Sequence, residues 1–187
     1  MNANETPMDE VSEPEPVRKL DLMTYYPKTA TLNHVSRGST LNGPQNIFMP
    51  GGKCVIQQAV LRADVAKITL GKCCYVAKGV LLHPPSYGAG FLPLTVGEFV
   101  WLGEDAVVRA ASIGSCVRVG SKAVLGERCI VKDCCWIMDG AVVPPDTVLA
   151  PYTCWAGSPA KLIRTLPESF GRMQEWELEQ NFADLCL

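Results

Sequence analysis

Residues 111–150 read ASIGSCVRVG SKAVLGERCI VKDCCWIMDG AVVPPDTVLA, and an aliphatic side chain recurs in this stretch at every sixth position. The recurring residues are all Val, Ile or Leu: Ile113, Val119, Leu125, Val131, Ile137, Val143 and Leu149. A fixed internal period of this kind is typical of repeat proteins. The period therefore decides the fold before any single motif is considered.

Most six-residue units also carry a second small or apolar residue two positions before the aliphatic one, such as Val117 before Val119 and Ala123 before Leu125. Because side chains alternate across a strand, this spacing marks one face of a very short strand. A turn must follow within the unit, and we expect glycines such as Gly114 to give the backbone its freedom there. The pattern favours a parallel β-helix over a β-sandwich, whose strands are spaced less regularly.

The repeat sets the expected organisation of the chain. It extends upstream, with a slip of one residue, through further aliphatics at Leu70, Val76, Leu82, Val96, Leu102 and Val108. We expect a β-helix over residues 21–160, with a Pro- and Gly-rich corner loop at 84–93. Residues 1–20 are acidic and Pro-rich, which predicts a disordered tail. Residues 161–187 are expected to form a link and a helix, because their apolar residues follow helical spacing.

The pattern resembles the hexapeptide-repeat family of left-handed β-helices. This resemblance implies an all-β fold in which three hexads make one triangular coil. It also implies a left-handed winding, an exception to the usual rule for crossovers between parallel strands. The expected fold is thus a left-handed parallel β-helix with a C-terminal α-helix packed on it.

Composition excludes several classes of function. The chain has 17 Lys+Arg against 19 Asp+Glu, a net charge of −2, and no dense basic cluster, so we expect no nucleic-acid binding. No apolar run of about 18 residues occurs, so we expect no direct membrane insertion. The nine cysteines never have C-x-x-C spacing and include two adjacent pairs. They indicate free thiols in a reducing compartment.

A possible metal site follows from the segment Arg62 to Asp64, which resembles the Arg-x-Asp element of γ-class carbonic anhydrases. In those enzymes three histidines hold zinc, and the resemblance places their positions at His83, Glu104 and Arg109. A guanidinium has no lone pair to donate and repels a cation. We therefore expect a degenerate site, with no metal, no cofactor and no catalytic residue. The alternative is a γ-carbonic-anhydrase-like enzyme, or an acyltransferase with His83 as its base.

The outward residues of the hexads form three rows, because strand neighbours alternate between the two faces. One row is apolar: Leu81, Val107, Val124 and Val142. A second has the composition of binding hot spots: Tyr75, Trp101, Arg118 and Trp136. The third begins with hydroxyls at Thr69, Thr95 and Ser112. One short helix cannot cover two faces, so we expect at least one of the first two rows to bind a partner protein.

Several short segments are similar to the dynactin subunit 5 family: residues 42–47, 61–64, 91–97, 111–120, 131–135 and 143–148. This resemblance implies a non-enzymatic subunit of the dynactin pointed-end complex, located in the cytoplasm and cytoskeleton. The implied partners are dynactin subunit 6, dynactin subunit 4, the pointed-end actin-related protein and dynein cargo adaptors. The implied role is to help dynein–dynactin bind cargo adaptors for microtubule-based transport.

Overall fold

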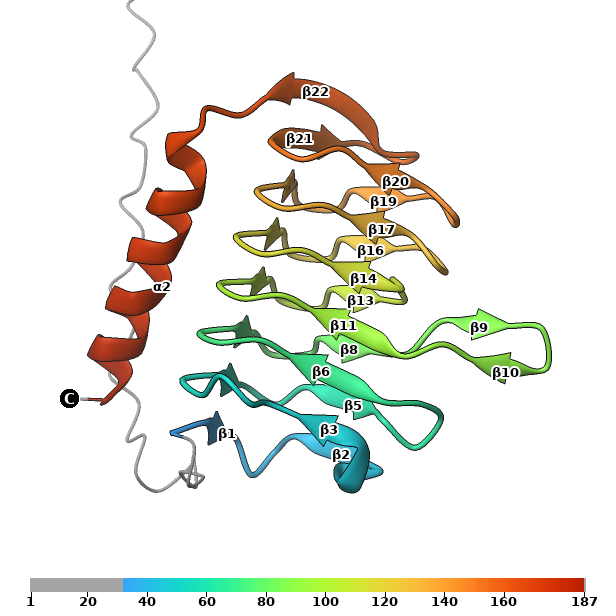
Figure 1. Cartoon of the computed structure of the whole chain (residues 1–187), viewed down its shortest axis with the longest axis vertical. Coiled ribbons are helices and arrows are strands. Elements are labelled where there is room, and N and C mark those ends of the chain that lie inside the picture. Colours follow the sequence, from blue (N-terminus) through green and yellow to red (C-terminus); the bar gives the residue numbers. More distant parts are fainter. Residues whose placement is uncertain (1–31, 187) are drawn as a thin grey trace, which may run out of the picture.

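The computed structural model describes residues 32–186 of the chain. Within them, short strands wind into a three-sided prism of stacked coils, and helix α2 (Ser169–Cys186) runs along one side of it (Figure 1). The predicted tail at 1–20 and residues 21–31 of the predicted β-helix lie outside the described residues.

Each full coil contributes one strand to each of three sheets. Sheet A has the order β1 (His34–Val35), β4 (Val55–Ile56), β7 (Tyr75–Val76), β12 (Trp101–Leu102), β15 (Arg118–Val119), β18 (Trp136–Ile137), β21 (Thr153–Ala156) and β22 (Lys161–Thr165). Sheet B stacks β2 (Thr40–Asn42), β5 (Val60–Arg62), β8 (Leu81–Leu82), β13 (Val107–Val108), β16 (Val124–Leu125) and β19 (Val142–Val143). Sheet C stacks β3 (Ile47–Phe48), β6 (Ile68–Leu70), β11 (Leu94–Val96), β14 (Ser112–Ile113), β17 (Ile130–Val131) and β20 (Val148–Leu149).

The six strands of sheets B and C give about six coils, and the short helix η1 (Pro44–Asn46) lies at a corner of the first coil. Successive strands within each sheet are parallel, except that β22 runs antiparallel to β21. The predicted left-handed parallel β-helix with a C-terminal helix is confirmed.

Hydrogen bonds between coils hold each residue above its counterpart in the coil before. Trp101 pairs with Arg118, 17 residues later, whereas Arg118 pairs with Trp136, 18 residues later. The one-residue slip predicted from the sequence is therefore a single shorter coil. It does not disturb the stacking, because the residue is lost from a turn and not from a strand.

Inward and outward positions alternate along the two-residue strands. Leu125 and Ile137 are fully buried inside the prism, whereas Val124 and Trp136, which precede them, are half-buried on its surface. Cys129 also points inward, and burial raises the pKa of its thiol to about 12. This thiol stays protonated at neutral pH and serves as a small apolar side chain in the narrow core.

The glycines after the aliphatics have a different role from the predicted one. Gly114 does not adopt a positive φ; that conformation falls on the second residue after it, Cys116, with φ of 56°. A Cβ on Gly114 would instead lie 2.7 Å from the backbone nitrogen of Asp133 in the next coil. The expectation of backbone freedom is wrong here, because glycine is required by the close approach of two coils.

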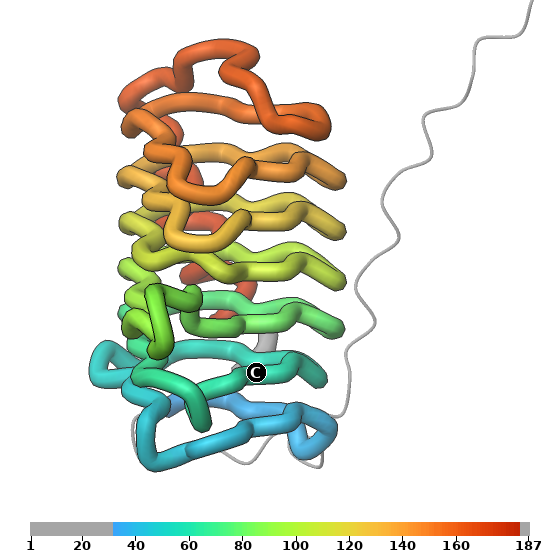
Figure 2. The backbone as a smooth tube through the Cα atoms, turned by 90° about the vertical axis from the view of Figure 1, so that its right-hand side faces the viewer, coloured from blue at the N-terminus to red at the C-terminus, as the bar shows by residue number. Residues whose placement is uncertain are grey.

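Two segments depart from the expected loops. Within residues 84–93, β9 (Ser86–Tyr87) and β10 (Gly90–Phe91) form an antiparallel hairpin that projects from the side of the prism away from α2 (Figures 1 and 2). Residues 161–165, expected as part of a link, form β22 and extend sheet A beyond the last coil. In the part of the chain that the structure describes, no helix combines the length and the apolar character needed to cross a membrane.

We predict that Leu125→Ala lowers the free energy of unfolding by about 3 kcal/mol, because it leaves a cavity in a core that cannot collapse onto it. Val124→Ala removes an outward side chain next to it and should cost less than about 1 kcal/mol. Urea unfolding of the two variants measures both values. An equal loss for Val124→Ala would contradict the inward–outward assignment.

Candidate docking faces and the degenerate metal site

His83 lies just after β8, where the chain leaves sheet B. Its Nδ1 atom is 2.8 Å from the carbonyl oxygen of Pro84, and its ring meets Phe91 edge-on with 5.7 Å between ring centroids. A carbonyl only accepts, so Nδ1 donates this hydrogen bond when the ring is neutral. The imidazole is thereby held at the base of the hairpin.

Of the other two residues that the resemblance assigns to zinc ligands, Arg109 is next to His83 in the stack and Glu104 lies at a different corner. Arg109 follows β13 directly above His83, since the His83 amide donates to the carbonyl of Val108. Glu104 lies between β12 and β13, at the corner that joins sheet A to sheet B. Within residues 32–186, no three His, Cys, Asp or Glu side chains are grouped so that they could hold a metal ion.

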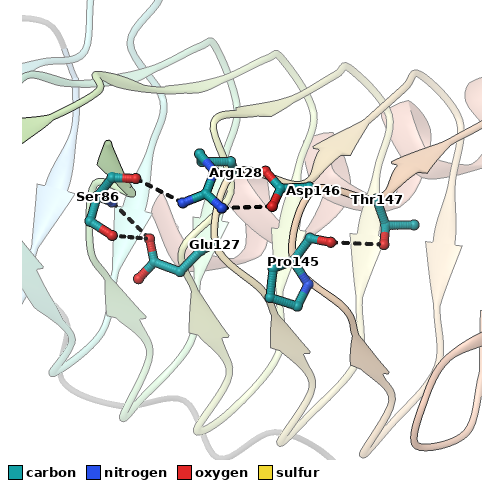
Figure 3. A network of polar contacts seen from close by, with 6 residues as sticks. All are labelled: Ser86, Glu127, Arg128, Pro145, Asp146 and Thr147. Atoms are coloured by element: carbon teal, nitrogen blue, oxygen red, sulfur yellow. Dashed lines mark hydrogen bonds and ion pairs between the residues drawn. The ribbon is translucent and has the colours of Figure 1, made fainter. Parts of the chain in front are cut away.

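Arg109 belongs instead to a polar network that holds the hairpin. Its Nη1 atom is 3.4 Å from Glu127, one coil further along the prism. The other oxygen of Glu127 accepts hydrogen bonds from the amide and the hydroxyl of Ser86, at 2.7 and 3.1 Å (Figure 3). One carboxylate thus connects a residue at a former ligand position to the first strand of the hairpin.

Arg128 completes this network from the opposite side. It donates to the carbonyl oxygen of Ser86 at 3.0 Å and forms two hydrogen bonds of 2.6 Å with Asp146 (Figure 3). The hydrogen bonds from Arg128 lower the pKa of Asp146 below its ordinary value of 3.8. We call Ser86, Glu127, Arg128 and Asp146 the hairpin clamp.

Sequence reasoning missed the hairpin clamp, although one signal was present. Arg128 and Asp146 are opposite charges separated by 18 residues, which is one coil of this prism. Their pairing could have been predicted once the coil length was known. The contact of both Glu127 and Arg128 with Ser86 could not, because it depends on how the inserted segment folds back.

The aromatic row lies on sheet A in the predicted register. Tyr75 and Trp101 stack with 4.2 Å between ring centroids, and the guanidinium of Arg118 lies 5.4 Å from the ring of Trp101. Helix α2 runs along this face from Phe170, beside β18, to Phe182, whose ring meets His34 of β1 edge-on with 5.5 Å between ring centroids (Figure 1). Arg118 forms hydrogen bonds of 2.7 and 2.9 Å with Glu177, and Trp136 stacks on Phe170.

Helix α2 therefore contacts residues that the sequence analysis proposed as binding sites for a partner protein. Arg118 and Trp136, two of the predicted partner-binding candidates, have their contacts with residues of α2. The observed covering agrees with the expectation that the helix packs on one row. It also leaves the apolar row as the better candidate for a docking face.

Small side chains let α2 approach the prism closely. Cys116 and Cys134 lie one above the other at the corner before sheet A, and both are buried with Phe170. A Cβ on Gly171 would lie 3.2 Å from the sulfur of Cys134. Burial and the neighbouring Cys134 raise the pKa of Cys116 to about 12, so this thiol is neutral and packs as an apolar group.

The apolar row lies on sheet B. Leu81 pairs with Val107, Val107 with Val124, and Val124 with Val142, so the four side chains form one column. All four are half-buried. Helix α2 contacts sheet A, on another side of the prism (Figure 1). A flat column of aliphatic side chains is a surface suited to a protein partner.

The fold and these faces define a hexapeptide-repeat β-helix protein, and comparison with known proteins narrows the class. The sequence profile of the family described as dynactin subunit 5 matches residues 19–179. Dynactin subunit 5 of Dictyostelium discoideum is 34% identical over 94 residues, which cover 48% of this chain and 48% of that protein. The chain belongs to the dynactin subunit 5 family.

Other relatives share the fold more broadly. Gamma carbonic anhydrase 2, mitochondrial, of Arabidopsis thaliana is 27% identical over 119 residues, covering 63% of this chain and 43% of that protein. A hexapeptide transferase family protein from Anaplasma phagocytophilum superposes with a TM-score of 0.59 at 22% identity, covering 80% of this chain and 90% of that chain. The chain spans about half the length of the first curated relatives that it matches.

We predict that Arg128→Ala raises the pKa of Asp146 toward 3.8, because the carboxylate loses its hydrogen-bonded cation. Since the pKa of Asp146 is lowered in the folded chain, the ion pair persists at neutral pH and is lost as the pH falls through that lowered value. An NMR titration of the Asp146 carboxyl carbon measures the change. Asp64, whose pKa is lowered by Arg62, is the control and should not respond. An unchanged pKa of Asp146 would contradict the hairpin clamp.

A second prediction concerns the seat of α2. Phe170→Ala removes a ring that is 3% exposed and stacked on Trp136, so α2 should lose its anchor on sheet A. Amide hydrogen exchange in residues 169–183 should accelerate at least tenfold. Trp176→Ala, which removes a ring that is 65% exposed, should leave the exchange unchanged. Equal effects of the two variants would show that Phe170 is not the anchor.

Proposed function

We propose that this chain is a non-enzymatic structural subunit of a dynactin complex, and that the faces of its prism bind other subunits. The match of the dynactin subunit 5 family to residues 19–179 is the observation that carries this proposal. The geometry of the former ligand positions supports it. Arg109 pairs with Glu127, which in turn binds the hairpin at Ser86, and Glu104 lies at a different corner.

The proposed partners are dynactin subunit 6, dynactin subunit 4 and the pointed-end actin-related protein. Through them the chain would help dynein–dynactin bind cargo adaptors for microtubule-based transport in the cytoplasm. The apolar row on sheet B supports a docking role, because its four aliphatic side chains form a straight, uncharged column. A partner that covers this column removes it from water, which favours association.

We predict that Val107→Glu combined with Val124→Glu weakens the complex with co-expressed dynactin subunit 6, subunit 4 and actin-related protein at least tenfold. The reason is that burying a carboxylate without a partner at the interface weakens the binding free energy by about 1–3 kcal/mol. The matched control is Thr95→Glu with Ser112→Glu, which places the same charges on sheet C. Affinity measured by surface plasmon resonance, with thermal melting as the check on folding, distinguishes the two faces. Equal binding of the sheet B variant and the wild type would contradict docking through this row.

The catalytic alternative is tested on the purified full chain. We expect it to retain no stoichiometric zinc after dialysis and to give no hydration of CO₂ above the uncatalysed rate. Elemental analysis and stopped-flow measurement of CO₂ hydration provide the two values. Zinc-dependent turnover that disappears in His83→Ala would replace the structural role by an enzymatic one.

A further inference from the structure

The β9–β10 hairpin has an anchored base, where Phe91 pairs with Ser86 and meets the ring of His83, and an exposed Tyr87 next to its turn. Tyr87 is 67% exposed and Phe91 is 43% exposed. The strands that carry them are two residues long, and a hairpin of this length has little stability of its own. Its conformation therefore depends on contacts with the rest of the prism.

Those contacts fix the backbone at the residue before Tyr87. The amide, the carbonyl and the hydroxyl of Ser86 are all bound by Glu127 and Arg128, which come from a later coil. Pro84 and Pro85, on the other side of Ser86, are buried and have restricted backbone angles. The backbone at the start of Tyr87 is thus fixed while its side chain is 67% exposed. Such an anchor loses little conformational entropy when a partner binds it.

The chemistry of the tip defines the partner. Residues 84–97 contain no charged side chain, and in the hairpin clamp the two charges of Glu127 and Asp146 offset that of Arg128 together with Arg109. A charged surface would gain no complementary contact from this tip. An uncharged cleft that accepts an aromatic ring, and a polar group for the hydroxyl of Tyr87, fits it.

Continuity with sheet B indicates where this partner sits. The hairpin follows Leu81 and Leu82 of β8, and Phe91 packs against His83 at the end of that strand. A partner seated on the apolar row would therefore meet the hairpin at the edge of the face. A second copy of this chain is the less favoured occupant, because the faces of the prism are flat parallel sheets and a ring requires a cleft.

We propose that the hairpin is a preorganised anchor whose Tyr87 enters an uncharged apolar cleft of the dynactin subunit bound on sheet B, with Phe91 at the rim of that contact. This inference rests on the proposed function and adds the element that contacts the partner. Glu127 and Arg128 act as positioning residues, since they hold Ser86 and do not contact the partner themselves. Arg109 supports the hairpin clamp from outside it, through its ion pair with Glu127.

A photo-crosslinking amino acid at position 87 of the full chain tests the contact, with position 176 on the exposed face of α2 as the control. In the complex with co-expressed dynactin subunit 6, subunit 4 and actin-related protein, position 87 should crosslink to one of these subunits and position 176 should not crosslink to that subunit. A complex that forms without a crosslink from position 87 would overturn the anchor and leave the proposed function standing. Failure of the wild-type chain to bind any of the three would overturn the proposed function itself. A crosslink from position 87 to a second copy of the chain would also overturn the inference.

A double-mutant cycle separates positioning from simple loss of stability. Tyr87→Ala and Arg128→Ala should each weaken binding about tenfold, and the double variant should be little weaker than Tyr87→Ala alone, because the clamp acts through the ring. Lys72→Ala removes a cation that lies over the ring of Phe99 at the corner between sheets C and A, away from sheet B and the hairpin, and should leave affinity unchanged. Fully additive losses from Tyr87→Ala and Arg128→Ala would show that the clamp does not position Tyr87.

Discussion

Hydrogen bonding between stacked coils is the constraint on which the rest of the structure depends. Each strand is only two or three residues long in most coils, so no strand is stable alone. Pairing the same positions of successive coils, at a strand spacing of about 4.8 Å, places like residues in columns. Aliphatics then fill the core, glycines stand where two coils nearly touch, and outward side chains line up into faces.

The same columns give a structural role to Arg109, at a position that the sequence analysis assigned to a degenerate metal site. Arg109 stands directly above His83 in the stack and pairs with Glu127, which in turn binds Ser86 of the hairpin. Charges that recur one coil apart, such as Arg128 and Asp146, pair across the stack. The polar residues at this corner therefore hold a projecting segment in place, in a family whose fold relatives include enzymes.

The sequence predicted what the six-residue period controls. It identified the coils, the slip and the three outward rows, because each follows from alternation and stacking. It did not place α2 on the row with Arg118 and Trp136. A helix of this composition fits the aromatic row or the apolar row, and only the contacts of Glu177 with Arg118 and of Phe170 with Trp136 decide between them. It missed β22 and the hairpin clamp, which depend on tertiary contacts between distant segments. The predicted role of Gly114 was wrong, because the close approach of two coils cannot be deduced from the residues of one strand.

The central claim is that sheet B and its hairpin form the docking face of a non-enzymatic subunit. Hydroxyl-radical footprinting of the chain, free and within purified dynactin, tests it most directly because it reports the exposure of individual side chains. Docking through this face should protect Leu81, Tyr87 and Phe91 in the complex, and leave Phe48 on sheet C and Trp176 on α2 as reactive as in the free chain. Protection confined to Phe48 or Trp176, with Leu81 and Tyr87 unchanged, would contradict the claim.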